Sequence, residues 1–368
     1  MRPTIEIEDR EELRRRIQEE MQLYGNACDL NHLDVSSITL MHGVFKDLPF
    51  TGDISKWDVS GAMTMDAMFE NCPFNGDISN WDVGGVDSMT GMFRGAKFSG
   101  DLSKWDVRNL QVLDEMFAYS QFNGDVSTWE LTLPATLNRV FAFSAFQGDI
   151  SNWNVSTVHS MIGTFEGSVF NGDISRWEVE NVQTFARMFK NSQFNGDISN
   201  WTMGRADNML EMFQGSAFNG DIARWNLSKV KEFNRMFQGS SFAGDLSNTE
   251  LRKYATCSGM FDEQFKGVLP HIGNLSDRFK TYGFMLGSSV ALRSYLKGRP
   301  FNAVHADVLL GATSKPSWAS AKDYEWCKEQ QAIAKSLGLD AASLRRLVVD
   351  NYHLRQTPSL ALPSLDMG

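Results

Sequence analysis

The chain has 368 residues, with 45 acidic and 35 basic side chains, a formal net charge of -10 and a sequence pI near 5.2. This acidic balance argues against a general binder of nucleic acids or anionic membranes, because such partners reward clusters of Lys and Arg. Four cysteines without metal-site spacing indicate reduced thiols; they are Cys28, Cys72, Cys257 and Cys327.

Residues 1–25 are expected to form an N-terminal cap. A short strand is predicted at 4–7, and an amphipathic helix at 9–24 has an apolar face that includes Leu13 and Ile17. A stack of repeats needs such an end-piece, because its first core layer would otherwise face water. The chain shows no signal-peptide core and no apolar run of membrane-spanning length. We therefore expect a cytoplasmic protein, with a non-classical or specialised secretion route as the alternative.

A phrase of 24 residues then repeats without a gap through most of the chain. Its Asp and Phe positions extend the register to ten units over 26–265. Self-similarity at such a period indicates a solenoid or propeller and takes precedence over local patterns. The repeat is marked by eight tryptophans: Trp57, Trp81, Trp105, Trp129, Trp153, Trp177, Trp201 and Trp225.

Each unit is predicted to contain a strand, a turn, a helix and a second turn. Ile78 and Val83 bracket a short extended segment whose alternate side chains point inward. Met89, Met92 and Phe93 follow at the spacing of one helical face. Gly or Asn stands two residues after the Phe in most units, which is typical of the left-handed turn that ends a helix. Stacking would pair equivalent strands in parallel and leave the helices on the other side.

The repeated phrase resembles a known family. Asp-Ile-Ser-x-Trp-Asp-Val, followed by Met-Phe and Phe-Asn-Gly, is similar to the BspA-like surface-protein repeat, a bacterial relative of leucine-rich repeats. Residues 28–35 look like the usual opening of such arrays. The resemblance implies a right-handed β/α solenoid of ten leucine-rich-repeat-like units with a parallel sheet. It also implies a role in adhesion or recognition, and no shared catalytic residue.

Beyond Phe261 the period fails. The remaining chain is expected to be a helical C-terminal cap or small domain over 266–356, followed by a flexible tail over 357–368. Ser320 is predicted to cap the third of its helices and Gly338 to end it. The four predicted helices lie near 275–284, 286–297, 320–337 and 340–352.

One weak motif in this region suggests DNA binding. Four residues have the spacing of a helix-turn-helix, with Arg345 and Arg346 on its second helix. An antiparallel helical hairpin gives the same spacing, and the acidic chain favours the hairpin, so we expect no nucleic-acid partner. The four residues are Ala334, Gly338, Leu344 and Leu347.

No motif in the sequence predicts catalysis or a cofactor. The six histidines are scattered, and the glycines belong to the repeat turns rather than to a phosphate-binding loop. The Trp, Met and Phe stripes are interpreted as the filling of a stacked core. Ten aspartates at one repeat position, from Asp29 to Asp245, could line up as metal ligands. We favour a structural role, in which each accepts backbone N–H bonds within a turn, and expect neither metal nor cofactor.

The residues on either side of each tryptophan are expected to form one concave, exposed face. Acidic residues follow the tryptophan, while basic and amide residues precede it. This pattern suits either charge compensation that keeps a sheet soluble or a polar recognition surface. The candidate binding residues are Lys56, Asp58, Asp82, Lys104, Asp106, Glu130, Arg176, Glu178 and Arg224.

The sequence therefore predicts a non-enzymatic scaffold that binds a protein through this face and the C-terminal region, with a glycan as the alternative ligand. The identity of the protein partner is open. Two other hypotheses stand beside it. In one, the chain is a secreted or phage-encoded effector whose C-terminal helical domain carries the activity. In the other, it is a structural subunit of a larger particle.

Overall fold

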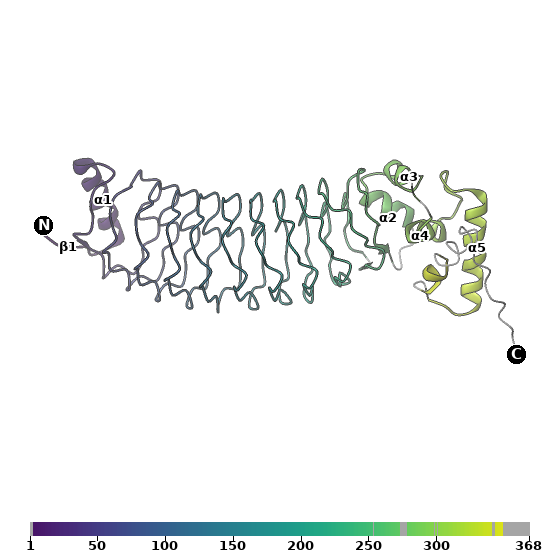
Figure 1. Ribbon diagram of the computed structural model, residues 1–368, viewed down its shortest axis with the longest axis horizontal. Coiled ribbons are helices and arrows are strands. Elements are labelled where there is room, and N and C mark those ends of the chain that lie inside the picture. Colours follow the sequence, from purple (N-terminus) through teal and green to yellow (C-terminus); the bar gives the residue numbers. More distant parts are fainter. Residues whose placement is uncertain are drawn as a thin grey trace.

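The computed structural model describes residues 3–252, 254–272, 278–297, 299, 301–340 and 343–348; the predicted tail at 357–368 lies outside them. The repeats form an elongated rod of stacked coils, with α1 (Arg10–Tyr24) at one end and a group of helices at the other (Figure 1). Parallel bridges join equivalent positions of successive coils without interruption from Leu40 to Thr256. The chain is therefore a repeat protein over most of its length.

The N-terminal cap forms as the sequence predicts. β1 (Ile5–Glu6) pairs in parallel with β2 (Leu33–Asp34) of the first coil. Asp9 caps α1, because its side chain accepts the backbone N–H of Glu12 at 2.8 Å. Leu13 and Ile17 of the predicted apolar face are buried against the first coil, whereas Tyr24 at the end of that face is exposed.

Two arginines of α1 take the place of a missing preceding coil. Arg10 donates to the carbonyl oxygen of His42 at 3.0 Å, and Arg14 donates to those of Val44 and Lys46 at 2.9 Å each. In the next coil, the equivalent carbonyls accept backbone N–H groups from the first coil. The arginines thus donate hydrogen bonds to the carbonyl groups at the open edge of the first coil. Without them, these carbonyls could pair with the backbone of another chain.

The predicted helix within each unit is wrong. No α-helix lies within the described part of 26–272, and the predicted helical stretch is a chain of turns. In the second coil, the N–H groups of Met68 and Glu70 bond three residues back, whereas those of Met65, Ala67 and Phe69 bond carbonyls of the next coil. We call residues 64–71 and their equivalents the turn ladder.

Left-handed backbone explains why no helix forms there. Two residues of every turn ladder except the last have positive φ, for example 51° at Ala67 and 56° at Asn71. Such residues interrupt a right-handed helix every four positions. The buried side chains still follow the helical spacing, since Met65, Met68 and Phe69 point inward. The periodicity was therefore real, but its cause is bonding between coils rather than within a helix.

The predicted sheet beside the tryptophans is also wrong for most coils. The N–H of Trp57 bonds the carbonyl of Ile54 in its own coil, and the other units repeat this turn. Among the described residues, the end coils pair here with β1 and β4, and the other bridges near this segment join only Asp29 to Asp53 and Asp245 to Val268. The continuous parallel contact between coils lies on the turn ladder instead.

Three columns of aromatic rings fill the core of the rod. Trp57 stacks on Trp81 with a centroid distance of 6.4 Å, and two columns of Phe run beside the Trp column. Each indole N–H also donates to a backbone carbonyl of the preceding coil, as in the 3.0 Å bond from Trp153 to Val126. The same bond recurs in all eight tryptophan units. The indoles therefore join coils by both packing and hydrogen bonding.

The C-terminal region continues one Phe column and then closes it. Phe265 stacks on Phe242 although it comes one residue early in the repeat, and Tyr295 stacks on Phe265 at 6.2 Å. The guanidinium of Arg299 lies 4.1 Å above the Tyr295 ring and donates to the carbonyl of Gly267 at 2.8 Å. The Arg299 guanidinium therefore covers the last ring of the column, Tyr295, with a charged group.

The C-terminal helices agree in part with the prediction. β4 (His271–Ile272) pairs in parallel with β3 (Glu250–Leu251), and the segment 343–348 is helical. Residues 349–352 of the fourth predicted helix lie outside the described residues. Ser320 caps the third predicted helix, and Gly338 follows its end with a φ of 65°. The helices are α2 (Arg278–Met285), α3 (Ser289–Lys297), α4 (Ala303–Gly311) and α5 (Ala321–Ser336).

The sequence prediction missed α4. Its residues Val304 to Leu309 are buried all round, so it has no polar face and no amphipathic period to detect. Its start carries a signal that was overlooked. Asn302 accepts the N–H groups of Val304 and His305 in a capping box.

Candidate functional site

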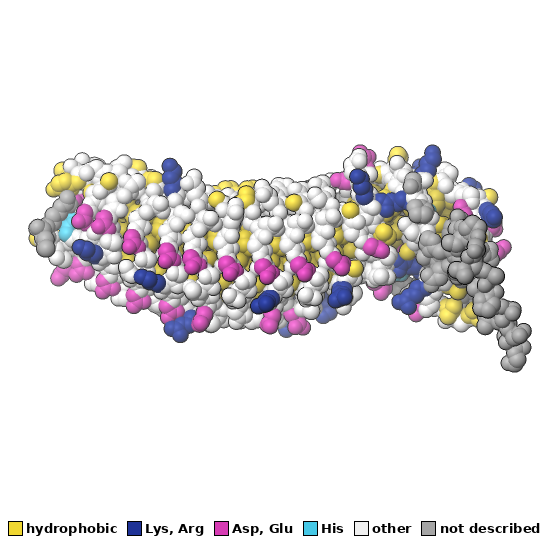
Figure 2. All heavy atoms as spheres, in the orientation of Figure 1, with side chains coloured by type: hydrophobic (Ala, Val, Ile, Leu, Met, Phe, Trp, Pro, Cys, Tyr) yellow, Lys and Arg dark blue, Asp and Glu magenta, His cyan; other side chains and the backbone are white. Residues whose placement is uncertain are grey.

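The residues predicted to bind a partner are all exposed. They lie immediately before and after the buried tryptophans, and we call these positions the tryptophan strip. Figure 2 shows rows of acidic side chains along the rod, with basic side chains spaced among them. The nine residues of the prediction, from Lys56 to Arg224, are thus presented at fixed intervals by the stacked core.

Several acidic residues of the tryptophan strip also hold turns. The Oδ1 atoms of Asp58, Asp82 and Asp106 accept the backbone N–H two residues on, at 3.0 to 3.1 Å. Hydrogen bonds from the Arg108 side chain and backbone lower the pKa of Asp106 to about 2. Asn154 makes the same turn in its own unit. The turn requires only a side-chain oxygen that accepts the N–H group, so the negative charge of the aspartates is not needed to form it.

A separate column of ten aspartates, four residues before each Trp position from Asp29 to Asp245, has the structural role that the sequence predicts. All ten aspartates accept, through Oδ1, the backbone N–H two residues on at 2.7 to 2.9 Å. A backbone N–H of serine is the main cause that lowers the carboxyl pKa in six of them. In the described residues, no three side chains of the His, Cys, Asp or Glu type cluster as a metal site would require. The six are Asp53, Asp77, Asp101, Asp149, Asp173 and Asp197.

These turns predict loss of stability in acid. A lowered carboxyl pKa in the folded state adds stability that is fully present above the unfolded value of about 3.9 and disappears as the pH falls through the folded value. We expect the Tm to fall progressively below about pH 5. A variant with Asp53, Asp101, Asp149 and Asp197 replaced by Asn keeps the turn oxygen and should show a shallower decline. Thermal unfolding followed by circular dichroism from pH 7 to 2 measures both slopes. Parallel slopes would contradict the prediction.

The turn ladder carries two groups of ion pairs that the sequence reasoning did not identify. The buried Glu70 pairs with Lys46 at 2.9 Å and with Arg94, which also reaches Glu115 at 3.2 Å. Farther along, the buried Glu211 is paired with three cations, as the carboxylate needs inside a protein. Burial raises the pKa of Glu211, but hydrogen bonds from Lys190 and Arg187 outweigh it, and the net shift is downward. The three cations are Arg187, Lys190 and Arg235.

Two exposed aromatic residues lie between these groups. Tyr119 and Phe143 occupy equivalent positions of adjacent turn ladders, and their rings stack in parallel with centroids 4.9 Å apart. Their side chains are exposed, whereas the other aromatic columns of the rod are buried. The signal was present in the sequence, because Gly or Asn holds this position in most other units.

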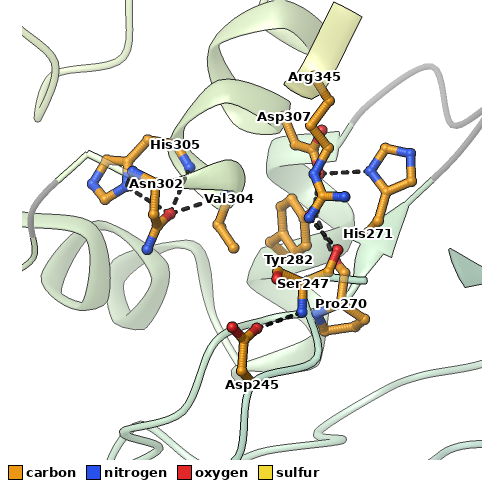
Figure 3. Close-up of polar contacts among 10 residues, drawn as sticks. All are labelled: Asp245, Ser247, Pro270, His271, Tyr282, Asn302, Val304, His305, Asp307 and Arg345. Atoms are coloured by element: carbon orange, nitrogen blue, oxygen red, sulfur yellow. Dashed lines mark hydrogen bonds and ion pairs between the residues drawn. The ribbon is translucent and has the colours of Figure 1, made fainter. Parts of the chain in front are cut away.

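A buried polar cluster joins the rod to the C-terminal helices (Figure 3). Asp307 of α4 accepts from the Tyr282 hydroxyl at 2.9 Å and lies 2.9 Å from Nδ1 of His271. The Nε atom of Arg345 is 3.7 Å from the same carboxylate, and its Nη2 donates to the carbonyl of Ser247 in the last coils. We call His271, Tyr282, Asp307 and Arg345 the junction cluster. It connects four separate segments of the chain through one carboxylate.

The neighbouring histidine of α4 does not belong to the junction cluster. His305 points away from Asp307, toward Asn302 and the carbonyl of Leu296 (Figure 3). Burial lowers the pKa of His305, so the neutral imidazole is favoured. His305 and Asp307 therefore contact different groups although they lie two residues apart on α4.

The structure also bears on the helix-turn-helix motif. Arg345 is turned into the junction cluster, and its side chain is only 12% exposed. It is therefore not presented to a DNA backbone, whereas Arg346 is exposed, and the helical hairpin stays a prediction. Across the described residues, no helix combines the length and apolarity needed to cross a bilayer.

The family comparison agrees with the geometry of the rod. Three overlapping segments match one family of repeats, at residues 18–129, 113–217 and 190–268, and together they cover the tryptophan strip and the turn ladders. Comparison with curated proteins and with solved structures returned no match. On this match over more than half of its length, the chain belongs to the family described as "Mycoplasma protein of unknown function, DUF285".

Proposed function

We propose that the protein is a non-enzymatic scaffold that recognises a protein partner along the tryptophan strip. The observation that carries this proposal is the fixed display of exposed charge, since each charged residue adjoins a buried indole bonded to the preceding coil. Side chains held in this way lose little conformational freedom when a partner binds. The C-terminal helices extend the rod and are expected to take part in binding.

The charge of the strip indicates the chemistry of the partner. Five successive units, from Asp34 to Glu130, carry a carboxylate directly after the Trp position. In these units, only Lys56 and Lys104 place a positive charge directly before the Trp position. A partner with a basic face would be steered to this half of the rod and held in register. Salt should therefore weaken the complex.

The relation to BspA-like repeats is a further part of the proposal. The shared Asp-Ile-Ser-x-Trp-Asp-Val phrase and the unbroken parallel bridges support a right-handed solenoid of ten units. We also place the protein in the cytoplasm, because its four cysteines are buried and lack the spacing of a metal site. The junction cluster supports a C-terminal cap rather than a separate effector domain, since it ties the helices to the last coils.

The test uses charge-neutral variants that keep the turns. The triple variant Asp82→Asn, Asp106→Asn and Glu178→Gln retains side-chain oxygens but loses three charges from the strip. We expect the partner isolated with the wild-type protein from native cells to bind the variant about tenfold more weakly, as exposed charges contribute up to about 1 kcal/mol each. The Tm should remain within about 2 °C.

A matched control removes the same charge from the adjacent aspartate column in the same units, as Asp77→Asn, Asp101→Asn and Asp173→Asn. Its affinity for the partner should stay near that of the wild type. Equal affinity of the strip variant and the wild type, measured by calorimetry at low salt, would overturn the proposed binding surface.

A further inference from the structure

A hollow lies on the surface of the turn ladder, away from the proposed binding surface. It measures about 250 Å³ and is lined by Glu70, Asn71, Arg94, Gly95 and Tyr119. It lies beside the exposed stack of Tyr119 and Phe143 and involves no residue of the tryptophan strip. Its lining combines an aromatic face with a carboxylate, an amide and a guanidinium.

The backbone at the aromatic pair is unusual for such large side chains. Tyr119 has a φ of 58° and Phe143 a φ of 54°, in the left-handed region. Glycine, Asn and Asp tolerate this region, but a bulky side chain there is energetically unfavourable. Most other units place the tolerant residues at this position: Asp47, Asn71, Gly95, Gly167, Asn191, Gly215 and Gly239. Unfavourable backbone at an exposed position points to a role other than stability.

The hollow exists because Gly95 has no side chain at this position of the repeat. The Phe143 side chain at this position leans over the next coil, since a Cβ on Gly167 would meet its ring at 2.3 Å. Phe143 in turn covers one face of Tyr119. A Cβ on Gly95 would likewise meet Oδ1 of Asn71 at 2.4 Å. The missing side chain of Gly95 therefore leaves a gap between the Asn71 amide and the Tyr119 ring.

The polar groups around this gap offer both donors and acceptors. Glu70 is buried and paired with Lys46 and Arg94, so its carboxylate is held in place. Arg94 is part-exposed, with its guanidinium between Glu70 and Glu115. Asn71 donates its amide N–H to Asp47 at 2.8 Å, which fixes its oxygen toward Gly95.

We propose that this hollow binds one neutral pyranose ring of a glycan. The C–H face of the sugar stacks on the negative π face of Tyr119. Its hydroxyl groups, which both donate and accept, meet the Arg94 guanidinium, the Glu70 carboxylate and the Asn71 oxygen. An aromatic side chain of a protein partner would fill the gap but could not bond the Asn71 oxygen or the remaining N–H groups of Arg94, whereas sugar hydroxyls can. A charged ligand would meet a like charge from either Glu70 or Arg94.

The experiment titrates the full-length protein with methyl glycosides of glucose, galactose, mannose and N-acetylglucosamine. Saturation-transfer NMR should detect saturable binding of at least one of them, with the sugar ring protons closest to the protein. Tyr119→Gly removes the stacking face, and Gly95→Asn fills the gap with a residue that the repeat accepts at this position. Each variant should lower the affinity at least tenfold.

Controls separate binding from folding. Tyr119→Gly relieves the unfavourable backbone and should have a Tm equal to or above that of the wild type. Asn191→Gly, at the equivalent position outside the hollow, should leave sugar binding unchanged. Absence of saturable binding by all four glycosides would overturn the proposal. So would unchanged affinity in both variants, or competition by N-acetyltryptophan amide at lower concentration than any sugar. The strip variants test the proposed function independently, since they leave this hollow intact.

Discussion

Replacement of Asp307 by Ala is expected to lower the free energy of unfolding of the C-terminal helices by about 3–5 kcal/mol. The carboxylate is 1% exposed and is contacted by His271, Tyr282 and Arg345. Its removal leaves the charge of Arg345 buried without that partner and empties the centre of the junction cluster. Because that arginine also bonds the carbonyl of Ser247, the effect should weaken the attachment of the helices to the rod.

Limited proteolysis and thermal unfolding measure this effect. The Asp307→Ala protein should lose its C-terminal helices to protease at a temperature where the coils remain protected. Glu329→Ala, an exposed change on α5, is the control and should alter stability by no more than about 0.5 kcal/mol. Equal protease resistance of Asp307→Ala and wild type would show that the junction cluster does not hold the helices.

The second large effect is expected in the middle of the rod. Trp153→Ala should destabilise the protein by about 3–5 kcal/mol, the range for removal of a large buried aromatic side chain. The indole is 3% exposed, stacks on Trp129 at 6.0 Å and donates to the carbonyl of Val126. Its loss therefore weakens contacts between neighbouring coils as well as within one.

Trp153→Phe separates the two contributions of the indole. It keeps an aromatic ring in the column but leaves the Val126 carbonyl without its N–H donor, which costs about 1–3 kcal/mol. Guanidinium unfolding should rank the wild type above Trp153→Phe and Trp153→Phe above Trp153→Ala. Identical midpoints for Trp153→Phe and wild type would indicate that the hydrogen bond contributes nothing.

The sequence predicted the repeat and its turns well, since these depend on interactions between neighbours. The unbroken spacing from Trp57 to Trp225 required equal coils, and the aspartates accept backbone N–H groups within turns, as predicted. The helix predicted at 9–24 likewise forms as α1, with Asp9 as its cap. In each case the physical cause lies within one repeat or one helical turn.

The helix prediction failed because one spacing can arise in two ways. Buried residues at Met65, Met68 and Phe69 fit a helical face, but glycine or another left-handed residue recurs every four positions in the turn ladder. The sequence showed Gly91 and Gly95 in the next unit, and two such residues so close together argue against a helix. Only the neighbouring coil reveals where the freed N–H groups go.

The candidate sites differ in how far the sequence could reveal them. Exposure of the tryptophan strip followed from its place beside the buried indoles, while its binding role stays a prediction. The pairing of Asp307 with His271 spans 36 residues and depends on α4, which is buried all round, so no local pattern could predict it. Tyr119 could have been found, because it departs from the Gly and Asn of equivalent positions.

The bonds between coils also constrain how such a chain can be inherited. The backbone N–H of Asn195 bonds the side chain of Asn171 at the equivalent position one coil earlier, as other units repeat. A short insertion in a turn ladder would mispair the coils on its two sides. Duplication or loss of a complete repeat, by contrast, restores equivalent neighbours and leaves both caps unchanged. Recombination between similar repeats can therefore alter the length of the rod in steps of one coil, without any new fold having to arise.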